Sequence, residues 1–342
     1  MKGAILYGPR DIRFEERETP EILNPTDAVI RLSATCVCGS DLWPYRGAQP
    51  IKGPSPMGHE YCGIVEDVGS AVKSVKPGQF AIGSFFASDN TCPHCRHGYQ
   101  TSCQQKKPVV GAQAPLLRVP LADGTLVPLA DLPSDDLIPS LLSLSDVMGT
   151  GWFAADAACV QAGSTVVVVG DGAVGLLGVL SARRMGAERI IAMSRHESRQ
   201  KLAREFGATD IVAERGDEGA ARIMELTNGV GADSVLECVG TQESMMQAID
   251  ATRPGGYMSY VGVPHGVELN GAGLFFTHVR LHGGPAPVRR YLPDLIDLVL
   301  RGQIDPGKVF DLTLPLDQVA EGYRAMDERR AIKALLLPLA QT

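Results

Sequence analysis

Five short apolar runs follow one another after Ser164, and stretches with helical spacing separate them. The runs are STVVVVG, ERIIAMS, ATDIVAE, DSVLECVG and GYMSYVG. Compact runs rich in β-branched residues are typical of strands buried on both faces. The stretches between them include LLGVLSARRMGA and SRQKLAREFGA. This alternation predicts an α/β domain with a doubly wound parallel sheet over residues 148–283.

The chain before this region has a different pattern, with short β runs broken by Gly and Pro. Examples are DAVIRLSATCV, GHEYCGIVEDVG, VKPGQFAIGSF and LLRVPLADGTLVPL. They predict an irregular, mostly β domain over residues 1–147. Residues 284–342 begin with another helical stretch and end in an apolar β run that comes too late for the alternating unit. We expect this segment to return to the first domain.

Length and charge narrow the classes of protein. A chain of 342 residues with 44% hydrophobic content is long enough for two domains. Its formal net charge of -7 disfavours nucleic-acid and membrane partners. The longest apolar stretch, TVVVVGDGAVGLLGVL, is shorter than the roughly 20 residues that span a bilayer. The first residues do not form a secretory signal, so we expect the mature protein to begin at Met1.

Eight cysteines in such a chain indicate metal ligands and buried thiols in a reducing cytoplasm, not a disulfide framework. Four of them lie outside the clusters described below and are predicted to be buried thiols: Cys36, Cys62, Cys159 and Cys238. Cys36 and Cys62 remain distant alternatives as metal ligands.

A glycine motif follows the first strand of the alternating unit. Gly170, Gly172 and Gly175 occupy the G-x-G-x-x-G positions, with Ala173 and Val174 inside the motif. Gly170 would permit a tight turn, Gly172 would let the backbone approach a pyrophosphate, and Gly175 would let the helix pack closely on the strand. This strand, turn and helix predict a Rossmann dinucleotide-binding domain. A glycine turn without a ligand is the alternative.

The end of the second strand decides which dinucleotide is expected. An NAD-binding chain usually has Asp or Glu there, whereas this chain has Ser194 and Arg195, with Arg199 one helical turn later. Guanidinium groups can bind a 2'-phosphate, so NADP(H) is preferred over NAD(H). The alternatives are that both arginines are solvated helix charges, or that Glu197 binds the ribose of NAD.

A second group of candidate residues lies in the first domain. The segments ATCVCGSDLW and PMGHEYCG contain Cys38, Asp41, His59 and Glu60 beside predicted strands. A thiolate and an imidazole in one domain suit zinc. Sequence spacing does not decide whether Cys38 and His59 meet, because a lone Cys or His is more often a core or surface residue.

The order of CGSD, GHE, a cysteine lobe and a nucleotide fold along the chain resembles the zinc-dependent alcohol dehydrogenases of the medium-chain dehydrogenase/reductase superfamily, over essentially the full length. The resemblance implies a GroES-like, mostly β catalytic domain beside the Rossmann domain. It implies that Cys38, His59 and Asp146 bind a catalytic zinc, as in the Asp-bearing bacterial branch. Glu60 would be able to approach the metal, and Asp41 would hold the His59 ring through its other nitrogen. A helix cap is the alternative role for Asp146.

The resemblance also assigns roles around the substrate. Ser40 matches the residue that hydrogen-bonds the substrate oxygen and passes its proton towards the cofactor ribose, and Thr150 falls where the family packs a Thr against the nicotinamide. Trp43 occupies the position where many relatives end the proton relay with His. An indole N–H donates but does not accept a proton, so water would have to complete the relay. Four aromatic residues are candidate pocket walls or plain core: Trp43, Phe85, Phe86 and Trp152.

The segment DNTCPHCRHGYQTSC corresponds to the family's structural zinc lobe, whose four cysteines have the spacing C-x2-C-x2-C-x7-C. The matching positions here are Asp89, Cys92, Cys95 and Cys103. An aspartate thus replaces one thiolate, and carboxylate oxygen binds zinc at about 2.0 to 2.2 Å, against about 2.3 Å for sulfur. His94 and His97 are alternative ligands that do not keep the spacing. A Cys92–Cys95 redox pair and an empty lobe are the rival interpretations.

These expectations combine into a zinc-dependent oxidoreductase that transfers a hydride between NADP(H) and an alcohol, aldehyde or ketone, with zinc as Lewis acid on the oxygen. Relatives are dimers or tetramers, so the resemblance implies a homo-oligomer, a tetramer or else a dimer. Two alternatives remain: a zinc-free quinone or enone reductase on the same fold, and a nucleotide-binding protein without turnover.

Overall fold

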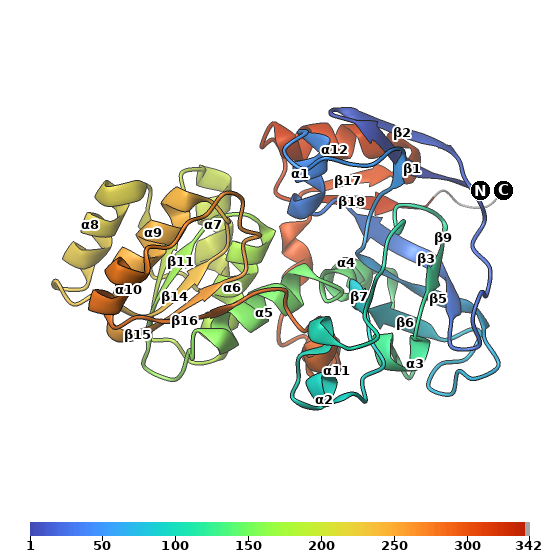
Figure 1. Ribbon diagram of the computed structural model, residues 1–342, viewed down its shortest axis with the longest axis horizontal. Helices are drawn as coiled ribbons and strands as arrows, with labels where there is room; N and C mark the ends of the chain where they lie inside the picture. The colour runs from blue at the N-terminus through green and yellow to red at the C-terminus, as the bar shows by residue number, and fades with distance from the viewer. Residues whose placement is uncertain (339–342) are drawn as a thin grey trace. The chain divides into compact units, whose positions relative to one another are not determined.

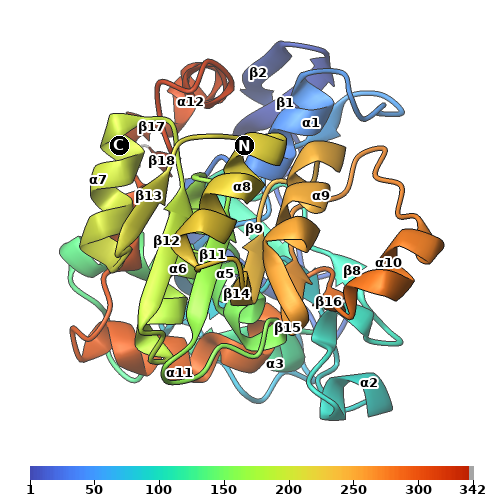
Figure 2. The same ribbon diagram turned by 90° about the vertical axis from the view of Figure 1, so that its left-hand side faces the viewer.

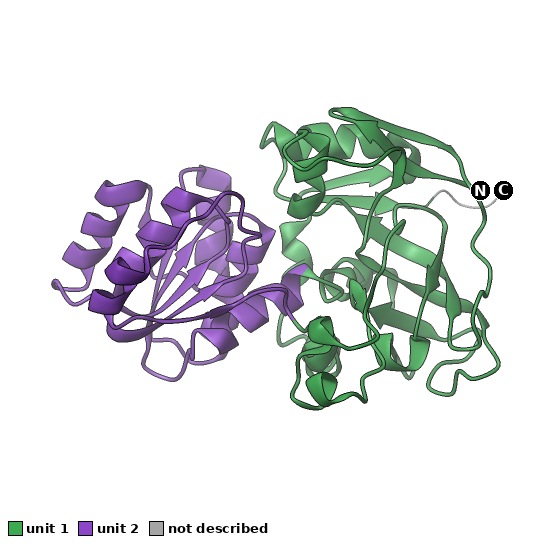
Figure 3. Ribbon diagram, viewed as in Figure 1, with its two compact units in different colours: residues 1–146, 287–342 green, residues 147–286 purple. Residues whose placement is uncertain are grey.

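The computed structural model describes residues 1–338 and divides the chain into two compact units. Unit 1 comprises residues 1–146 and 287–342, and unit 2 comprises residues 147–286 (Figure 3). The boundaries expected from the sequence, at 147/148 and 283/284, lie within a few residues of these. Residues 339–342, the end of the predicted C-terminal segment, lie outside the described residues.

Unit 2 contains a sheet of six parallel strands in the order β13-β12-β11-β14-β15-β16 (Figure 2). Its strands are β11 (Thr165–Val169), β12 (Arg189–Met193), β13 (Asp210–Val212), β14 (Ala232–Glu237), β15 (Thr252–Tyr260) and β16 (Arg280–Gly283). Its helices are α5 (Val147–Ala157), α6 (Ala173–Arg184), α7 (Glu197–Phe206), α8 (Gly216–Leu226), α9 (Gln242–Ala251) and α10 (Gly271–Thr277). This strand order is that of the doubly wound fold, so the predicted fold class is confirmed.

The strands form where the sequence offers stiff, apolar residues. β11 contains four consecutive valines that are at most 2% exposed, because the strand lies between β12 and β14 and is covered on both faces. Strand β16 was not predicted. Arg280 and His282 alternate with Leu281 along it, and this mixed pattern at the edge of the sheet lacks the apolar run of the inner strands.

Unit 1 is mostly β and contains a seven-stranded sheet in the order β10-β6-β5-β3-β18-β17, with β9 paired to β3. Figure 1 labels β3, β5, β6, β9, β17 and β18 of this sheet. Two small sheets, β2-β1-β4 and β7-β8, complete it. Its strands are β1 (Lys2–Gly8), β2 (Asp11–Glu16), β3 (Ala28–Cys36), β4 (Ser55–Pro56), β5 (Tyr61–Val68), β6 (Phe80–Gly83), β7 (Phe86–Ala87), β8 (Lys107–Pro108), β9 (Leu116–Val119), β10 (Leu126–Pro128), β17 (Leu312–Pro315) and β18 (Ala334–Leu337).

Helices in unit 1 are mostly short. The α-helices are α1 (Leu42–Tyr45), α2 (Pro93–Arg96), α3 (Ala122–Thr125), α4 (Ile138–Ser143), α11 (Val288–Leu300) and α12 (Val319–Asp327). Five 3-10 turns are η1 (Gly39–Asp41), η2 (Gln100–Ser102), η3 (Asp135–Leu137), η4 (Pro306–Val309) and η5 (Leu316–Gln318). Loops and turns of this kind carry most of the polar residues of the candidate metal sites described below.

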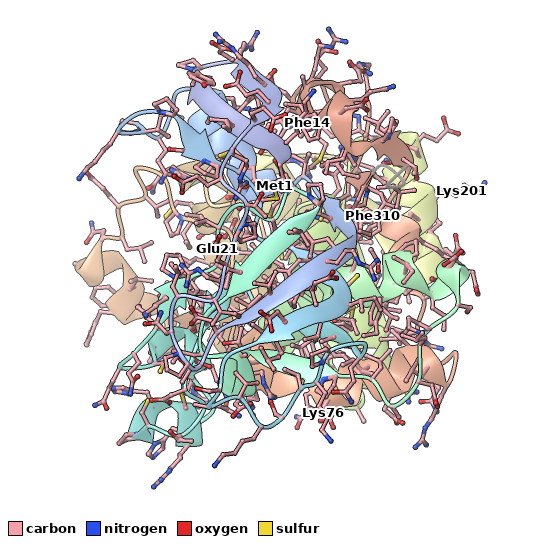
Figure 4. All side chains as sticks on the ribbon, turned by 90° about the vertical axis from the view of Figure 1, so that its right-hand side faces the viewer. Met1, Phe14, Glu21, Lys76, Lys201 and Phe310 are labelled. Atoms are coloured by element: carbon pink, nitrogen blue, oxygen red, sulfur yellow. The ribbon has the colours of Figure 1, made fainter. Side chains whose placement is uncertain are left out.

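The C-terminal strand β18 is an inner strand of the unit 1 sheet. It pairs antiparallel with β3, where Leu335 lies opposite Cys36, and parallel with β17. One core cluster therefore combines the two ends of the chain: Leu6 and Leu336 are buried in it, and Phe14, labelled in Figure 4, packs against it. Among residues 1–338, no helix has the length and apolar character that crossing a membrane requires.

Candidate active site and metal centres

Four potential metal ligands converge in unit 1. One donor atom from each of Cys38, His59, Glu60 and Asp146 lies within 4.8 Å of the others. Cys38 follows the end of β3, while His59 and Glu60 precede β5. Since these strands pair antiparallel, with Thr35 opposite Tyr61, the two segments meet at one end of the sheet. Sequence spacing alone did not establish this meeting.

Asp146 reaches the cluster from the turn between α4 and α5. Its Oδ2 lies 3.5 Å from Cys38 Sγ and 3.2 Å from His59 Nε2. The neighbouring Ser145 is fully buried, and its Oγ accepts a hydrogen bond of 3.2 Å from the backbone N–H of Tyr61. This bond fixes the turn beside β5 and places the carboxylate at the cluster.

Asp41 holds two of the donors in place. Its Oδ1 lies 3.3 Å from His59 Nδ1, and its Oδ2 accepts the backbone N–H of Cys38 at 3.0 Å. Gln113 donates from Nε2 to the same Oδ2 at 3.3 Å. A carboxylate on Nδ1 leaves Nε2 free to face a metal ion, which is the usual arrangement for a ligating histidine. The contribution of Gln113 has no signal in the sequence.

The electrostatics of the cluster favour a cation. Burial raises the pKa of the Cys38 thiol, and the carboxylates of Asp146 and Glu60 raise it further. Burial opposes the charged form of His59, but Asp41 and Cys38 outweigh it and raise the pKa of the ring well above its usual value. Crowded buried anions of this kind are stabilised by a bound divalent ion, and sulfur, nitrogen and oxygen donors together suit zinc.

Glu60 has a buried partner, Lys333, which no sequence pattern indicated. Lys333 Nζ lies 2.6 Å from Glu60 Oε1, and the side chains are 1% and 0% exposed. Lys333 also donates to the Val37 carbonyl at 3.2 Å and lies 5.8 Å from the ring of Phe310, which Figure 4 labels. Glu60 Oε2 is buried without a hydrogen-bond partner among residues 1–338, so it is available to a cation.

The second group of donors is the lobe of Asp89, Cys92, Cys95 and Cys103, whose donor atoms lie within 4.8 Å of one another. Cys92 Sγ lies 3.5 Å from Cys95 Sγ and 3.9 Å from Cys103 Sγ, and none of these thiols forms a disulfide. The Asp89 carboxylate also accepts the N–H groups of Thr91 and Cys92. The structure does not bring His94 or His97 into this group.

These donors fit a closed zinc site, and Asp89 tests the assignment. Because Asp89 would supply the fourth ligand, Asp89→Ala is expected to lower the zinc content from about two ions per chain to about one. Elemental analysis of the purified protein measures this. Asp67→Ala is a matched control, since exposed Asp67 also accepts a backbone N–H but belongs to neither donor group. Unchanged zinc in Asp89→Ala would remove Asp89 from the site.

The glycine motif in unit 2 has the backbone that close dinucleotide binding needs. Gly170 has a φ of +119°, which L residues rarely adopt, and a Cβ on Gly175 would lie 2.1 Å from the Gly170 carbonyl oxygen. No atom lies within 4 Å of the Cβ position of Gly172, so its surface is open. Helix α6 starts at Ala173 and directs its N-terminal N–H groups towards this turn.

The residues expected at the cofactor ribose lie at the end of β12. Ser194 is fully buried, whereas Arg195 and Glu197 are exposed. Arg199 lies in α7 and forms an ion pair of 3.3 Å with Asp171, the residue between the first two glycines of the motif. No sequence pattern assigned Asp171 a role.

The remaining predicted residues are distributed over both units. Ser40 is partly buried in η1 and Trp43 is partly buried in α1. The ring of Phe85 lies edge-on to that of His59 at 6.1 Å and 5.3 Å from the ring of Phe86. Thr150 and Trp152 lie on α5 in unit 2, with Thr150 buried and Trp152 partly buried.

The prediction of buried thiols was wrong for two of the four cysteines. Cys36 and Cys62 are buried, but Cys159 is exposed and Cys238 is only partly buried. Cys159 follows α5 in a left-handed conformation with a φ of +52°, which turns the chain at the surface. Cys238 comes directly after β14, where the strand leaves the core.

Comparisons with known proteins agree with this arrangement. Residues 24–138 match the alcohol dehydrogenase GroES-like domain, and residues 173–301 match the zinc-binding dehydrogenase family. The chain is 33% identical to zinc-type alcohol dehydrogenase B of Aspergillus flavus, over 98% of this chain and 81% of that one. It is 31% identical to an NADP-dependent isopropanol dehydrogenase of Clostridium beijerinckii, over 98% of this chain and 100% of that one.

Among solved structures, the alcohol dehydrogenase TADH from Thermus sp. ATN1 is similar, with a TM-score of 0.90 and 30% sequence identity. The match covers 99% of this chain and 100% of the Thermus chain. Full-length similarity of sequence and fold, together with two groups of zinc-type donors, shows that the chain belongs to the zinc-dependent alcohol dehydrogenases of the medium-chain dehydrogenase/reductase superfamily.

Proposed function

We propose that this protein transfers a hydride between NADP(H) and an apolar alcohol, aldehyde or ketone. One observation carries the proposal: the donor atoms of Cys38, His59 and Asp146, together with one from Glu60, lie within 4.8 Å of one another. A zinc ion held there would act as a Lewis acid on the substrate oxygen.

The protein's own residues orient the site and handle the proton. Asp41 fixes the ring of His59 and the backbone of Cys38. Ser40, which precedes Asp41 in η1, matches the family position that hydrogen-bonds the substrate oxygen, and we assign it the transfer of the substrate proton. Trp43 has only an N–H donor, so water carries the proton onward.

The proposed substrate class rests on the aromatic residues near His59. Phe85 packs edge-on against the His59 ring and contacts Phe86, so the approach to the donors in unit 1 is partly apolar. Such a surface favours carbonyl compounds with short apolar substituents over charged substrates.

The preference for NADP(H) rests on Ser194 and Arg195, which occupy the end of β12 where NAD-binding chains usually carry a carboxylate. Exposed Arg195 offers a guanidinium to a 2'-phosphate. The similarity to a relative that is named NADP-dependent points the same way.

The experiment that tests the function is a panel of aldehydes and ketones assayed with NADPH and with NADH. Turnover is expected to be faster with NADPH at equal concentration, to disappear after chelation, and to return when zinc is added. Turnover that survives complete metal removal would instead show zinc-free carbonyl or enone reduction. Cofactor binding without turnover on any substrate would indicate a non-catalytic protein.

We also infer a homo-oligomer, a tetramer or else a dimer. Strand β16 ends the described sheet of unit 2, and the preceding helix α10 exposes Phe275 and Phe276 at 76% and 78%. An open strand edge beside exposed aromatic rings suits pairing with a second copy of the chain. A single-chain mass in sedimentation equilibrium would contradict this inference.

A further inference from the structure

Asp171 brings a carboxylate to the end of β12 from a neighbouring strand. β11 and β12 are parallel and in register, with Val169 opposite Met193, so the residues that follow both strands leave the sheet at the same edge. Asp171 Oδ2 accepts a hydrogen bond of 2.8 Å from Ser194 Oγ across this edge. A carboxylate is thus present where the sequence of β12 itself offers none.

The contacts around Asp171 fix its position. The backbone N–H of Ser194 donates to the Val212 carbonyl, and Gln200 Nε2 donates to the Ser194 carbonyl at 2.8 Å, so Ser194 is held from both sides. Arg199 Nη1 lies 3.3 Å from Asp171 Oδ1 and donates to the Asp171 carbonyl at 3.2 Å. The side chains of Arg199 and Asp171 are only 11% and 16% exposed.

These contacts change the charge available to a 2'-phosphate. The carboxylate of Asp171 offsets the charge of Arg199, whereas exposed Arg195 has no ion-pair partner among residues 1–338. Arg195, Arg199 and Asp171 together carry a net charge of about +1, against +2 for the two arginines alone, and the exposed carboxylate of Glu197 lies on the same segment. A neutral ribose 2'-hydroxyl can donate to a carboxylate, but a 2'-phosphate is repelled by it.

We propose that Asp171 is a specificity-determining residue that moderates the preference for NADP(H) and keeps NAD(H) usable. The proposal rests on the proposed dinucleotide chemistry of unit 2. It predicts that the carboxylate weakens binding of the 2'-phosphate through its charge and supports binding of the 2'-hydroxyl as an acceptor.

The test measures dissociation constants of NADPH and NADH for the full chain, by cofactor fluorescence without substrate. Asp171→Asn keeps the size and most hydrogen bonds of Asp171 and removes its charge. The ratio of the NADH to the NADPH dissociation constant is expected to rise roughly tenfold, the scale for removing one unit charge near a partly screened phosphate. Arg199→Gln, which leaves the carboxylate without its cation, is expected to lower the ratio.

Asp210→Asn is the matched control. Asp210 forms an ion pair of 2.9 Å with Arg189, the first residue of β12, at the opposite end of this strand from Ser194. Its removal is expected to leave the ratio unchanged.

If the ratio of dissociation constants in Asp171→Asn stays within twofold of the wild-type ratio, the proposal is overturned. The same holds if the variant loses affinity for both cofactors equally, and Asp171 is then a structural residue of the turn. If the wild-type protein binds the cofactors but reduces no carbonyl compound, the proposed function fails while the ratio still decides the role of Asp171. Binding of neither cofactor at millimolar concentration would overturn both.

Discussion

Replacing Cys38 by alanine is expected to lower carbonyl reduction by a factor of about 1000 or more. The thiolate is one of three ligands that would hold the catalytic ion, and polarisation of the substrate oxygen by that ion is worth several kcal/mol of barrier. The zinc content is expected to fall by about one ion per chain. NADPH binding is expected to persist, because the glycine motif belongs to unit 2 and Cys38 to unit 1.

Cys159→Ala is a suitable control for this variant, since Cys159 is exposed and lies outside both donor groups. It is expected to retain the zinc content and activity of the wild type. Turnover in Cys38→Ala comparable to the wild type would rule out Cys38 as a ligand of a catalytic metal. Loss of NADPH binding together with activity would point to misfolding, which circular dichroism and thermal unfolding would reveal.

Replacing Lys333 by methionine is expected to destabilise the metal-free protein by about 3 to 5 kcal/mol, because it leaves the buried carboxylate of Glu60 without its cation. For a unit of this size, the melting temperature is expected to fall by roughly 6 to 20 °C. Thermal unfolding of the chelated protein measures the change. Zinc is expected to restore part of the loss, since a bound divalent ion supplies positive charge beside Glu60.

Two further variants separate charge from packing at this position. The double variant Lys333→Met with Glu60→Gln is expected to recover part of the stability, because no buried charge remains unpaired. Lys308→Met removes a lysine whose ion pair of 3.8 Å with Asp305 is exposed to solvent, and is expected to cost about 1 kcal/mol or less. Equal melting temperatures for Lys333→Met and the wild type would show that the buried pair contributes nothing to stability.

The fold could be predicted well where its signals are local. Alternating β-branched runs and helices predicted unit 2, because each strand of a parallel sheet covered on both faces is itself an apolar run. The same rule failed for β16 at the sheet edge, where Arg280 and His282 interrupt the pattern. The glycine motif was visible since Gly170 and Gly175 are required by backbone geometry that only glycine satisfies.

The candidate metal site was less accessible to sequence reasoning. Whether Cys38 meets His59 depends on the register of β3 against β5. The sequence of either strand alone does not determine that register. Asp146 entered only through family resemblance, because one aspartate near a turn carries no periodic signal. Lys333 is 273 residues from Glu60 in the sequence, and no motif or spacing near either residue predicts that they form a pair.

Asp171 was missed for a different reason. The usual rule looks for an acidic residue at the end of the second strand, whereas here the carboxylate comes from the turn after the first strand. The register between β11 and β12 is needed to see that Asp171, which follows β11, lies beside Ser194, which follows β12.

The inner position of β18 has a consequence for how the chain acquires its structure during synthesis. Unit 2 is contiguous, so all its residues have been synthesised once translation has passed residue 286. The sheet of unit 1 stays open until its last strand, Ala334–Leu337, is made and inserted beside β3. The first domain in the sequence is thus completed after the second, and a nascent chain exposes the part of β3 at Thr35 and Cys36 until β18 pairs with it.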